Sequence, residues 1–142
     1  YVATVTRAYR KALDHLYNNN VDYLPFRNDL FNVSHREFST GFYYGRDEIE
    51  MPTFKSYMTE AKFLGSIEEK ISDNVYRLDV KNQITTKDNI EYIGPDLLYM
   101  ADYGFTILDE EMNPVEKTDH GKIAYIKTDK SLKKGYIIRK KE

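Results

Sequence analysis

The 142-residue sequence contains no cysteine and no tryptophan. The lack of cysteine excludes disulfides, thiolate nucleophiles and cysteine-held zinc or iron–sulfur sites within this chain, and it fits a reducing compartment. No apolar run approaches the ~20 residues that cross a membrane, and residues 1–4 have none of the features of a signal peptide. We therefore expect a cytoplasmic chain without a membrane partner. Because it does not begin with methionine, we also expect it to be a piece of a larger protein.

An excess of charge of one sign is also lacking. The net charge is -2 and the pI is about 6.0, so no overall field selects nucleic acid or a membrane surface. Hydrophobic residues make up 41% and aromatic residues 14% of the chain, with 13 tyrosines. This composition is too apolar for a disordered chain and sufficient for one folded domain.

Residues 4–17 are predicted to form an amphipathic helix, because apolar residues recur at steps of three or four. Polar residues, among them Arg7, fall mostly on the opposite face. The apolar face must pack on the rest of this chain or on a domain absent from it, because so short a helix is marginal alone. After Pro25 we expect one or two further helical turns, and then an irregular connection over residues 34–58. The apolar positions are Val5, Ala8, Tyr9, Ala12, Leu13 and Leu16.

From Ala61 onward the hydrophobic period becomes two, which is typical of strands. Tyr76, Leu78 and Val80 alternate most clearly with polar residues. Short strands separated by turn residues favour a barrel or sandwich, and a closed barrel avoids two exposed edges. The expected fold class is mainly β: an N-terminal helix and irregular segment followed by a small six-stranded β-barrel. The expected strands are 63–67, 76–80, 90–93, 103–108, 122–127 and 136–139.

The run Ser34-His35-Arg36-Glu37 resembles a catalytic triad in composition only. Adjacent residues cannot align a hydroxyl on an imidazole, so a capping box with Ser34 as N-cap and Glu37 at N3 is the better interpretation. A third hypothesis makes His35 and Arg36 part of a site shared with an absent domain.

Neither the histidines nor the acidic residues predict a catalytic or metal site. His15, His35 and His120 have no metal-ligand spacing. The cluster Asp109-Glu110-Glu111 is interpreted as a solvated turn. We expect no catalytic residue, no metal ligand and no cofactor in this chain.

The C-terminal region is rich in basic residues with tyrosines among them. This combination favours RNA, with charge for phosphates and rings for bases. The alternative is a soluble surface with a lysine-rich end. The candidate RNA-binding residues are Lys127, Lys130, Lys133, Lys134, Tyr136, Arg139, Lys140 and Lys141.

Residues 33–45 read Val-Ser-His-Arg-Glu-Phe-Ser-Thr-Gly-Phe-Tyr-Tyr-Gly. This segment resembles the signature V-S-H-R-E-[YF]-x-T-G-F-Y-[FY]-G of the collagenase-like peptidase family U32, and similar residues follow along the whole chain. The resemblance implies three segments: a helical linker from the end of a catalytic domain (1–33), the signature connection (34–58) and a C-terminal β-barrel similar to those of translation factors (59–142). The signature residues, expected to be structural, are Ser34, His35, Arg36, Glu37, Thr40, Gly41, Phe42, Tyr43 and Gly45.

The resemblance also implies a catalytic domain upstream of this chain, which holds an iron–sulfur cluster in the hydroxylating members of the family. It leaves two hypotheses for function. In the first, the chain is a non-catalytic accessory domain of a collagenase-like peptidase that presents a protein substrate or stabilises the enzyme. In the second, it is the RNA-contacting domain of an enzyme that hydroxylates tRNA at the wobble uridine, or ribosomal RNA. In both, the chain by itself is expected to be inactive.

Overall fold

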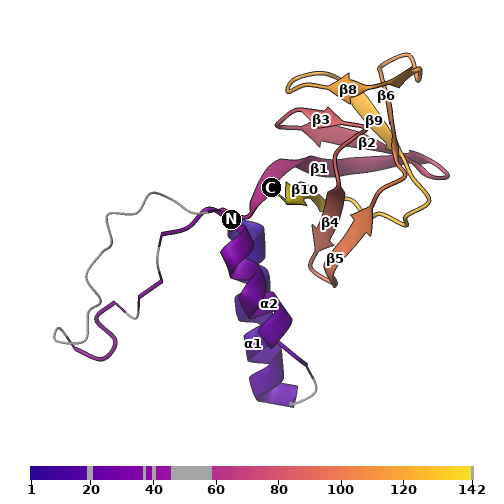
Figure 1. Cartoon of the computed structure of the whole chain (residues 1–142). Helices are drawn as coiled ribbons and strands as arrows, with labels where there is room; N and C mark the ends of the chain where they lie inside the picture. Colours follow the sequence, from indigo (N-terminus) through magenta and orange to yellow (C-terminus); the bar gives the residue numbers. More distant parts are fainter. Residues whose placement is uncertain (19–20, 37, 40, 46–58, 142) are drawn as a thin grey trace. The chain divides into compact units, whose positions relative to one another are not determined.

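The computed structural model describes residues 1–18, 21–36, 38–39, 41–45 and 59–141. These residues fall into two compact units, Tyr1–Glu60 and Ala61–Glu142. The first is helical and the second is built of strands (Figure 1). The N-terminal helix and the mainly β class expected from the sequence are confirmed.

The helical unit contains α1 (Val2–Asn18), α2 (Leu24–Asn28) and the 3-10 helix η1 (Asp29–Asn32). Pro25 lies in the first turn of α2, where its missing N–H costs no intrahelical hydrogen bond. Both the helix expected over residues 4–17 and the helical turns expected after Pro25 are present.

The face of α1 that packs shares only its margin, at Ala8, with the expected apolar face. Thr4 and Ala8 are buried, whereas Tyr9 is 69% and Leu16 is 73% exposed. Hydrophobic periodicity identifies an amphipathic helix but does not say which face the rest of the chain covers. In this unit, α2 and η1 cover the more polar side of α1.

Arg7 explains this choice of face. Its guanidinium forms an ion pair with Asp29 of η1, and both side chains are at most 5% exposed. The Arg7 guanidinium carbon also lies 5.3 Å from the centroid of the Phe26 ring, a cation–π distance. The spacing of residues within the helix gave no sign of this ion pair, because the partner of Arg7 is 22 residues away in sequence.

The strands of the β unit pair antiparallel. Each of the six expected strands is found, and the short or weakly alternating β3, β5, β7 and β8 were not expected. The strands are β1 (Ala61–Ser72), β2 (Val75–Val80), β3 (Ile84–Thr85), β4 (Ile90–Gly94), β5 (Leu97–Asp102), β6 (Thr106–Leu108), β7 (Pro114–Val115), β8 (Lys117–Thr118), β9 (Ala124–Lys127) and β10 (Ile137–Lys141).

The main sheet has the strand order β5-β4-β10-β1-β2-β9-β6-β7, and β3 and β8 form a separate ladder. No pairing joins β5 to β7 among the described residues, so the expected closed six-stranded barrel is replaced by an open sheet of eight strands. Pro114 occupies the β7 edge and has no N–H to donate to a further strand. Figure 1 shows that the sheet is strongly curved.

The core is formed by side chains that alternate along the strands. On β2, Tyr76, Leu78 and Val80 are all less than 5% exposed, which confirms the alternation predicted there. The largest fully buried side chains are Leu64, Ile67, Ile84, Ile90, Tyr92, Ile107, Ile126 and Ile138.

The centre of the sheet is β1, which pairs with β10 in its first half and with β2 in its second. Gly65 pairs with both neighbours, opposite Ile138 and Val80. A Cβ at Gly65 would lie 2.3 Å from the carbonyl oxygen of Asp79. Only glycine allows the backbones of β1 and β2 to approach this closely.

Candidate nucleic-acid interface

Four of the seven basic C-terminal residues lie beside a carboxylate: Lys130, Lys133, Arg139 and Lys140. The Nε of Arg139 on β10 donates to Oε1 of Glu91 on β4 at 2.7 Å, directly across the ladder. Arg139 is only 4% and Glu91 only 7% exposed. The structure therefore places Arg139 in the packing of the sheet, and its guanidinium does not reach a surface that RNA could contact.

Tyr136 and Lys133 converge on Asp96, in the turn between β4 and β5. The Tyr136 hydroxyl donates to Asp96 Oδ1 at 2.8 Å, and the Lys133 ammonium forms an ion pair with the same carboxylate. The hydrogen bonds from Lys133 and Tyr136 lower the pKa of Asp96 to about 2. The Tyr136 ring is 5% exposed, so it is not available for stacking on a base, contrary to expectation.

Lys140 and Lys130 also have acidic neighbours. Lys140 Nζ donates to Asp88 Oδ1 at 2.8 Å. Burial alone would raise the pKa of Asp88, but hydrogen bonds from Lys140 and the Thr85 backbone N–H outweigh it and lower that pKa. Lys130 lies 3.2 Å from the adjacent Asp129, an exposed pair that restrains the lysine little.

Three candidate lysines remain: Lys127, Lys134 and Lys141. All three are exposed, and none forms an ion pair with another residue in the part of the chain that the structure describes. The predicted basic surface is therefore reduced from seven cations to these three and the weakly held Lys130.

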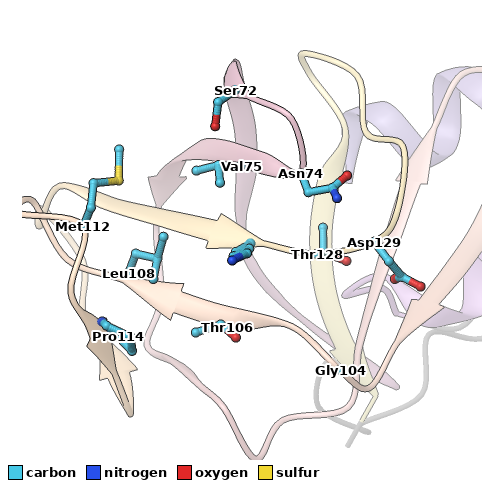
Figure 2. Close-up of a pocket in the computed structure, with 11 residues that line it drawn as sticks. Ser72, Asn74, Val75, Gly104, Thr106, Leu108, Met112, Pro114, Thr128 and Asp129 are labelled. Atoms are coloured by element: carbon cyan, nitrogen blue, oxygen red, sulfur yellow. The ribbon is translucent and has the colours of Figure 1, made fainter.

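Beside Lys127 the surface of the β unit is hollowed into a groove of about 680 Å³ (Figure 2). Lys127 lies at the end of β9, in register with Val75 of β2 and Thr106 of β6. Figure 2 shows the hairpin β1–β2 on one side of the groove and the β6–β7 hairpin on another. The lining residues are Ser72, Asn74, Val75, Gly104, Thr106, Leu108, Met112, Pro114, Lys127, Thr128 and Asp129.

A buried carboxylate supports one end of the groove. Asp102 accepts hydrogen bonds from the Tyr92 hydroxyl at 2.9 Å, the Thr128 hydroxyl at 2.5 Å and the Gly104 N–H at 3.1 Å. We call these four residues the Asp102 network. Thr128 also donates its backbone N–H to the Asn74 carbonyl at 2.9 Å, which ties the β1–β2 turn to the end of β9.

The β6–β7 turn that forms the opposite side is equally well bonded. Asp109 Oδ1 accepts the N–H groups of Glu111 and Asn113, each at 2.9 Å. The backbone of Met112 takes a φ of 65°. Met112 is 43% exposed and lines the groove. The acidic cluster at 109–111 is thus a turn, as expected, and its first carboxylate stabilises that turn.

The signature segment contains a small aromatic cluster around His35. The His35 ring stacks on Phe38 with centroids 4.7 Å apart, and Phe31 meets both rings edge-on. His35 Nδ1 lies 2.7 Å from the Val33 carbonyl oxygen, and the residue is 8% exposed. These contacts give His35 a packing role within the helical unit.

The capping box predicted for this segment does not start a helix. Ser34 lies in a bend, the described residues after it are not helical, and Glu37 lies outside the described residues. Arg36 is exposed. The role of His35 and Arg36 in a site shared with an absent domain stays a prediction.

The rest of the signature is a turn with exposed aromatics. Gly41 and Gly45 take the left-handed φ values of 56° and 103°, which favour glycine. Phe42 is 73% and Tyr43 is 92% exposed, so neither ring is packed in a core. Thr40 lies outside the described residues.

The other two histidines also face backbone carbonyls. His15 Nδ1 lies 2.8 Å from the Val21 oxygen, and His120 Nδ1 lies 3.1 Å from the Val80 oxygen. The described residues contain no group of three acidic or histidine side chains that could hold a metal ion. Within the same residues, no helix is long and apolar enough to cross a membrane.

Sequence reasoning identified one groove residue, Lys127, and missed the others. The groove draws on four separate segments of the chain, and its residues share no spacing or motif. The turn residues at 72–74 and 109–113 were recognisable as turns, but nothing in the sequence indicates that strand pairing brings them together.

Two family matches together cover most of the chain and point to the same family. Residues 59–139 match the peptidase family U32 C-terminal domain, and residues 1–53 match peptidase family U32. Over 99% of its length, the chain is 27% identical to the tRNA hydroxylation protein P1 of Bacillus subtilis (strain 168). The chain spans 35% of the length of that relative.

Two crystal structures of the C-terminal domain of a Geobacillus thermoleovorans protein, described as a U32 peptidase, resemble the chain. The selenomethionine variant has a TM-score of 0.50 and 21% identity, and the match covers 56% of this chain and 99% of that domain. The second structure has a TM-score of 0.48 and 22% identity, over 57% of this chain and 92% of the domain. The likeness to the first supports the fold and says nothing of activity.

Proposed function

The chain belongs to peptidase family U32, and on that premise we propose that it is the C-terminal, tRNA-contacting part of an enzyme that hydroxylates tRNA. The observation that carries the proposal is the similarity to a tRNA hydroxylation protein over 99% of this chain. Because the match includes the helical unit, the signature segment and the β unit together, it supports a shared role for the whole region. The chain spans about a third of the length of that relative. The hydroxylation reaction of the whole protein is therefore part of what we propose.

The exposed lysines limit how strongly the chain can bind tRNA. Lys127, Lys134 and Lys141 have no acidic partner among the described residues, whereas Lys133 and Lys140 are paired. Three phosphate contacts would give a slope of log affinity against log salt of roughly -2 to -3. We therefore expect weak, salt-sensitive binding of tRNA, in keeping with a domain that assists a catalytic domain.

A titration of fluorescent tRNA with the chain at low and physiological salt tests this contact. Neutralising Lys134 and Lys141 together with Lys→Gln changes should weaken binding and flatten the salt slope by roughly 1.4–1.8. The matched control neutralises Lys70 and Lys81, which lie within 3.2 Å of exposed carboxylates. Equal effects of the two double variants, or no tRNA binding at low salt, would remove the tRNA contact from the proposal.

A genetic experiment tests the reaction. Deleting the gene for the full protein should remove one hydroxylated nucleoside from bulk tRNA, measured by mass spectrometry of digested tRNA. Re-expression of the full protein should restore it. An unchanged nucleoside profile would contradict the proposal and favour the alternative, an accessory domain of a peptidase.

The peptidase alternative draws on the family name alone. Each of the three histidines has Nδ1 within 3.1 Å of a backbone carbonyl oxygen. In that position the ring nitrogen is held by the backbone, and no described serine or threonine hydroxyl bonds to a histidine ring as a nucleophile–base pair requires. Incubation of the chain with casein or gelatin should leave both substrates intact.

A further inference from the structure

The groove beside Lys127 combines an apolar floor with polar side chains around it. Val75, Leu108, Met112 and Pro114 contribute apolar atoms from β2, β6 and the β6–β7 hairpin. A volume of about 680 Å³ lies in the usual range of small-molecule sites. The floor suits a flat apolar surface such as one face of a base.

Polar groups are available where such a ligand would meet the rim. The side chains of Ser72, Asn74 and Thr106 make no hydrogen bond to another described residue, and all three line the groove. The Thr128 hydroxyl is engaged with Asp102. Hydroxyl and amide groups of this kind bond equally well to a ribose or to the edge of a base.

The charge of the groove matches one phosphate. Lys127 is the cation in the lining, and the one carboxylate there, Asp129, lies 3.2 Å from Lys130. A nucleotide carries a single backbone phosphate for each base, which one ammonium can neutralise. An acidic peptide would bring several carboxylates toward the neighbouring Glu110 and Glu111 with only one lysine to receive them.

Hydrogen bonds within the chain hold both sides of the groove in place without a ligand. Asn74 is bonded to Thr128, Thr128 is bonded to buried Asp102, and Asp109 holds the turn that presents Met112. A site held in this way loses little conformational entropy when it binds a ligand.

We propose that this groove binds one nucleotide of single-stranded RNA, with the base on the apolar floor and the phosphate at Lys127. The inference rests on the proposed tRNA contact and adds a location and a substrate form to it. It predicts that the β unit reads an unpaired stretch of tRNA, because a base within a duplex has both faces stacked.

Methyl NMR on the whole chain offers a direct test. The four methionines can be labelled with ¹³C at the methyl group and titrated with hexauridylate, an oligonucleotide that forms no duplex. The Met112 signal should move, whereas Met100, which packs against the core, should not. A hexa-aspartate peptide at the same concentration should move neither signal.

A charge substitution supplies the second readout. Lys127→Gln should weaken hexauridylate binding about three- to five-fold and lower the salt slope by ~0.7. The matched control is Lys122→Gln, an exposed lysine a few residues earlier that does not line the groove. Circular dichroism of both variants confirms that each is folded.

The outcomes separate this inference from the function on which it rests. If tRNA binds but Met112 stays unmoved and Lys127→Gln equals Lys122→Gln, the groove is not the nucleotide site and the tRNA contact lies elsewhere. If neither tRNA nor hexauridylate binds, the proposed function fails together with the groove. If hexa-aspartate moves Met112 and hexauridylate does not, the groove binds acidic peptides and the inference is overturned.

Discussion

Replacing Asp102 with alanine should destabilise the β unit by about 3 kcal/mol. The carboxylate is 2% exposed and accepts three hydrogen bonds within the Asp102 network. Its removal leaves the hydroxyls of Tyr92 and Thr128, 0% and 4% exposed, without their acceptor. Each buried donor left unsatisfied costs about 1–3 kcal/mol. Removing the buried Asp102 carboxylate also removes the cost of desolvating it, which offsets part of the cost of the two unsatisfied hydroxyls.

Urea unfolding followed by amide NMR signals of β9 and β10 measures this cost for the β unit separately from the helices. Thermal unfolding should agree, since about 1 kcal/mol lowers the Tm of a domain this size by ~4–8 °C. Asp79→Ala is the matched control, because that carboxylate is 46% exposed and pairs with Lys81 at the surface. It should change the free energy of unfolding by less than ~0.5 kcal/mol.

The coupling within the network is a sharper measurement than any single change. Tyr92→Phe should cost about 1.5–2 kcal/mol alone and much less when Asp102 is already alanine. The interaction energy from this double-mutant cycle should be at least ~1 kcal/mol. Strictly additive effects, or a cost below ~1 kcal/mol for Asp102→Ala, would refute the reasoning that this carboxylate organises the end of the groove.

The same network predicts a pH dependence at the alkaline end. Burial and the nearby Asp102 carboxylate raise the pKa of Tyr92 well above its ordinary value of 10.0. The folded state therefore favours the protonated phenol. Its stabilising contribution is complete below pH ~10 and is lost as the pH rises beyond it. Tyr92→Phe should remove this component, which alkaline urea titrations would detect as a shallower fall in stability.

Three further predictions concern other parts of the chain. Arg7→Ala should cost about 3–5 kcal/mol by leaving the buried Asp29 carboxylate uncompensated, measured as loss of helical circular dichroism in urea, whereas the exposed Arg10→Ala should cost under ~0.5 kcal/mol. Phe42→Ala should leave the free energy of unfolding within ~0.5 kcal/mol, since that ring is 73% exposed; a loss of several kcal/mol would show that the ring is buried. The lowered pKa of Asp96, about 2 against 3.8, stabilises the fold above pH ~4 and this stabilisation fades toward pH 2, so Asp96→Asn should flatten the acid limb of stability against pH.

Local patterns predicted the elements better than their arrangement. The alternation of Tyr76, Leu78 and Val80 predicted β2 correctly, and the periodicity of residues 4–17 predicted α1. Strands of two residues, such as β3, are too short to show a period. The closed barrel was inferred because exposed edge strands leave backbone groups unpaired. In the structure, Pro114 on the edge strand β7 has no N–H to leave unpaired.

The candidate site was harder to predict because charge counted along the sequence ignores partners brought by folding. Lys133, Lys140 and Arg139 belong to one basic tail in sequence, but the β10–β4 ladder and the turns at its ends set them beside acidic residues. Arg7 gives the same lesson on a helix. Hydrophobic periodicity predicts which face of a helix is polar. It does not predict whether another element of the fold covers that face.

The close approach of β1 and β2 at Gly65 restricts which residues this position can accept in evolution. Even a methyl group there would meet the Asp79 carbonyl oxygen at 2.3 Å, so every single-base change that replaces this glycine must push β1 away from β2. The Leu64 carbonyl oxygen next to it also receives two backbone donors, from Lys81 and Asn82, and these bonds would be displaced with the strand. Replacing an exposed lysine disturbs no packing, whereas any side chain at position 65 strains the pairing of β1 with β2. A glycine at this position is thus a more demanding requirement of the fold than any of the exposed lysines of the C-terminal region.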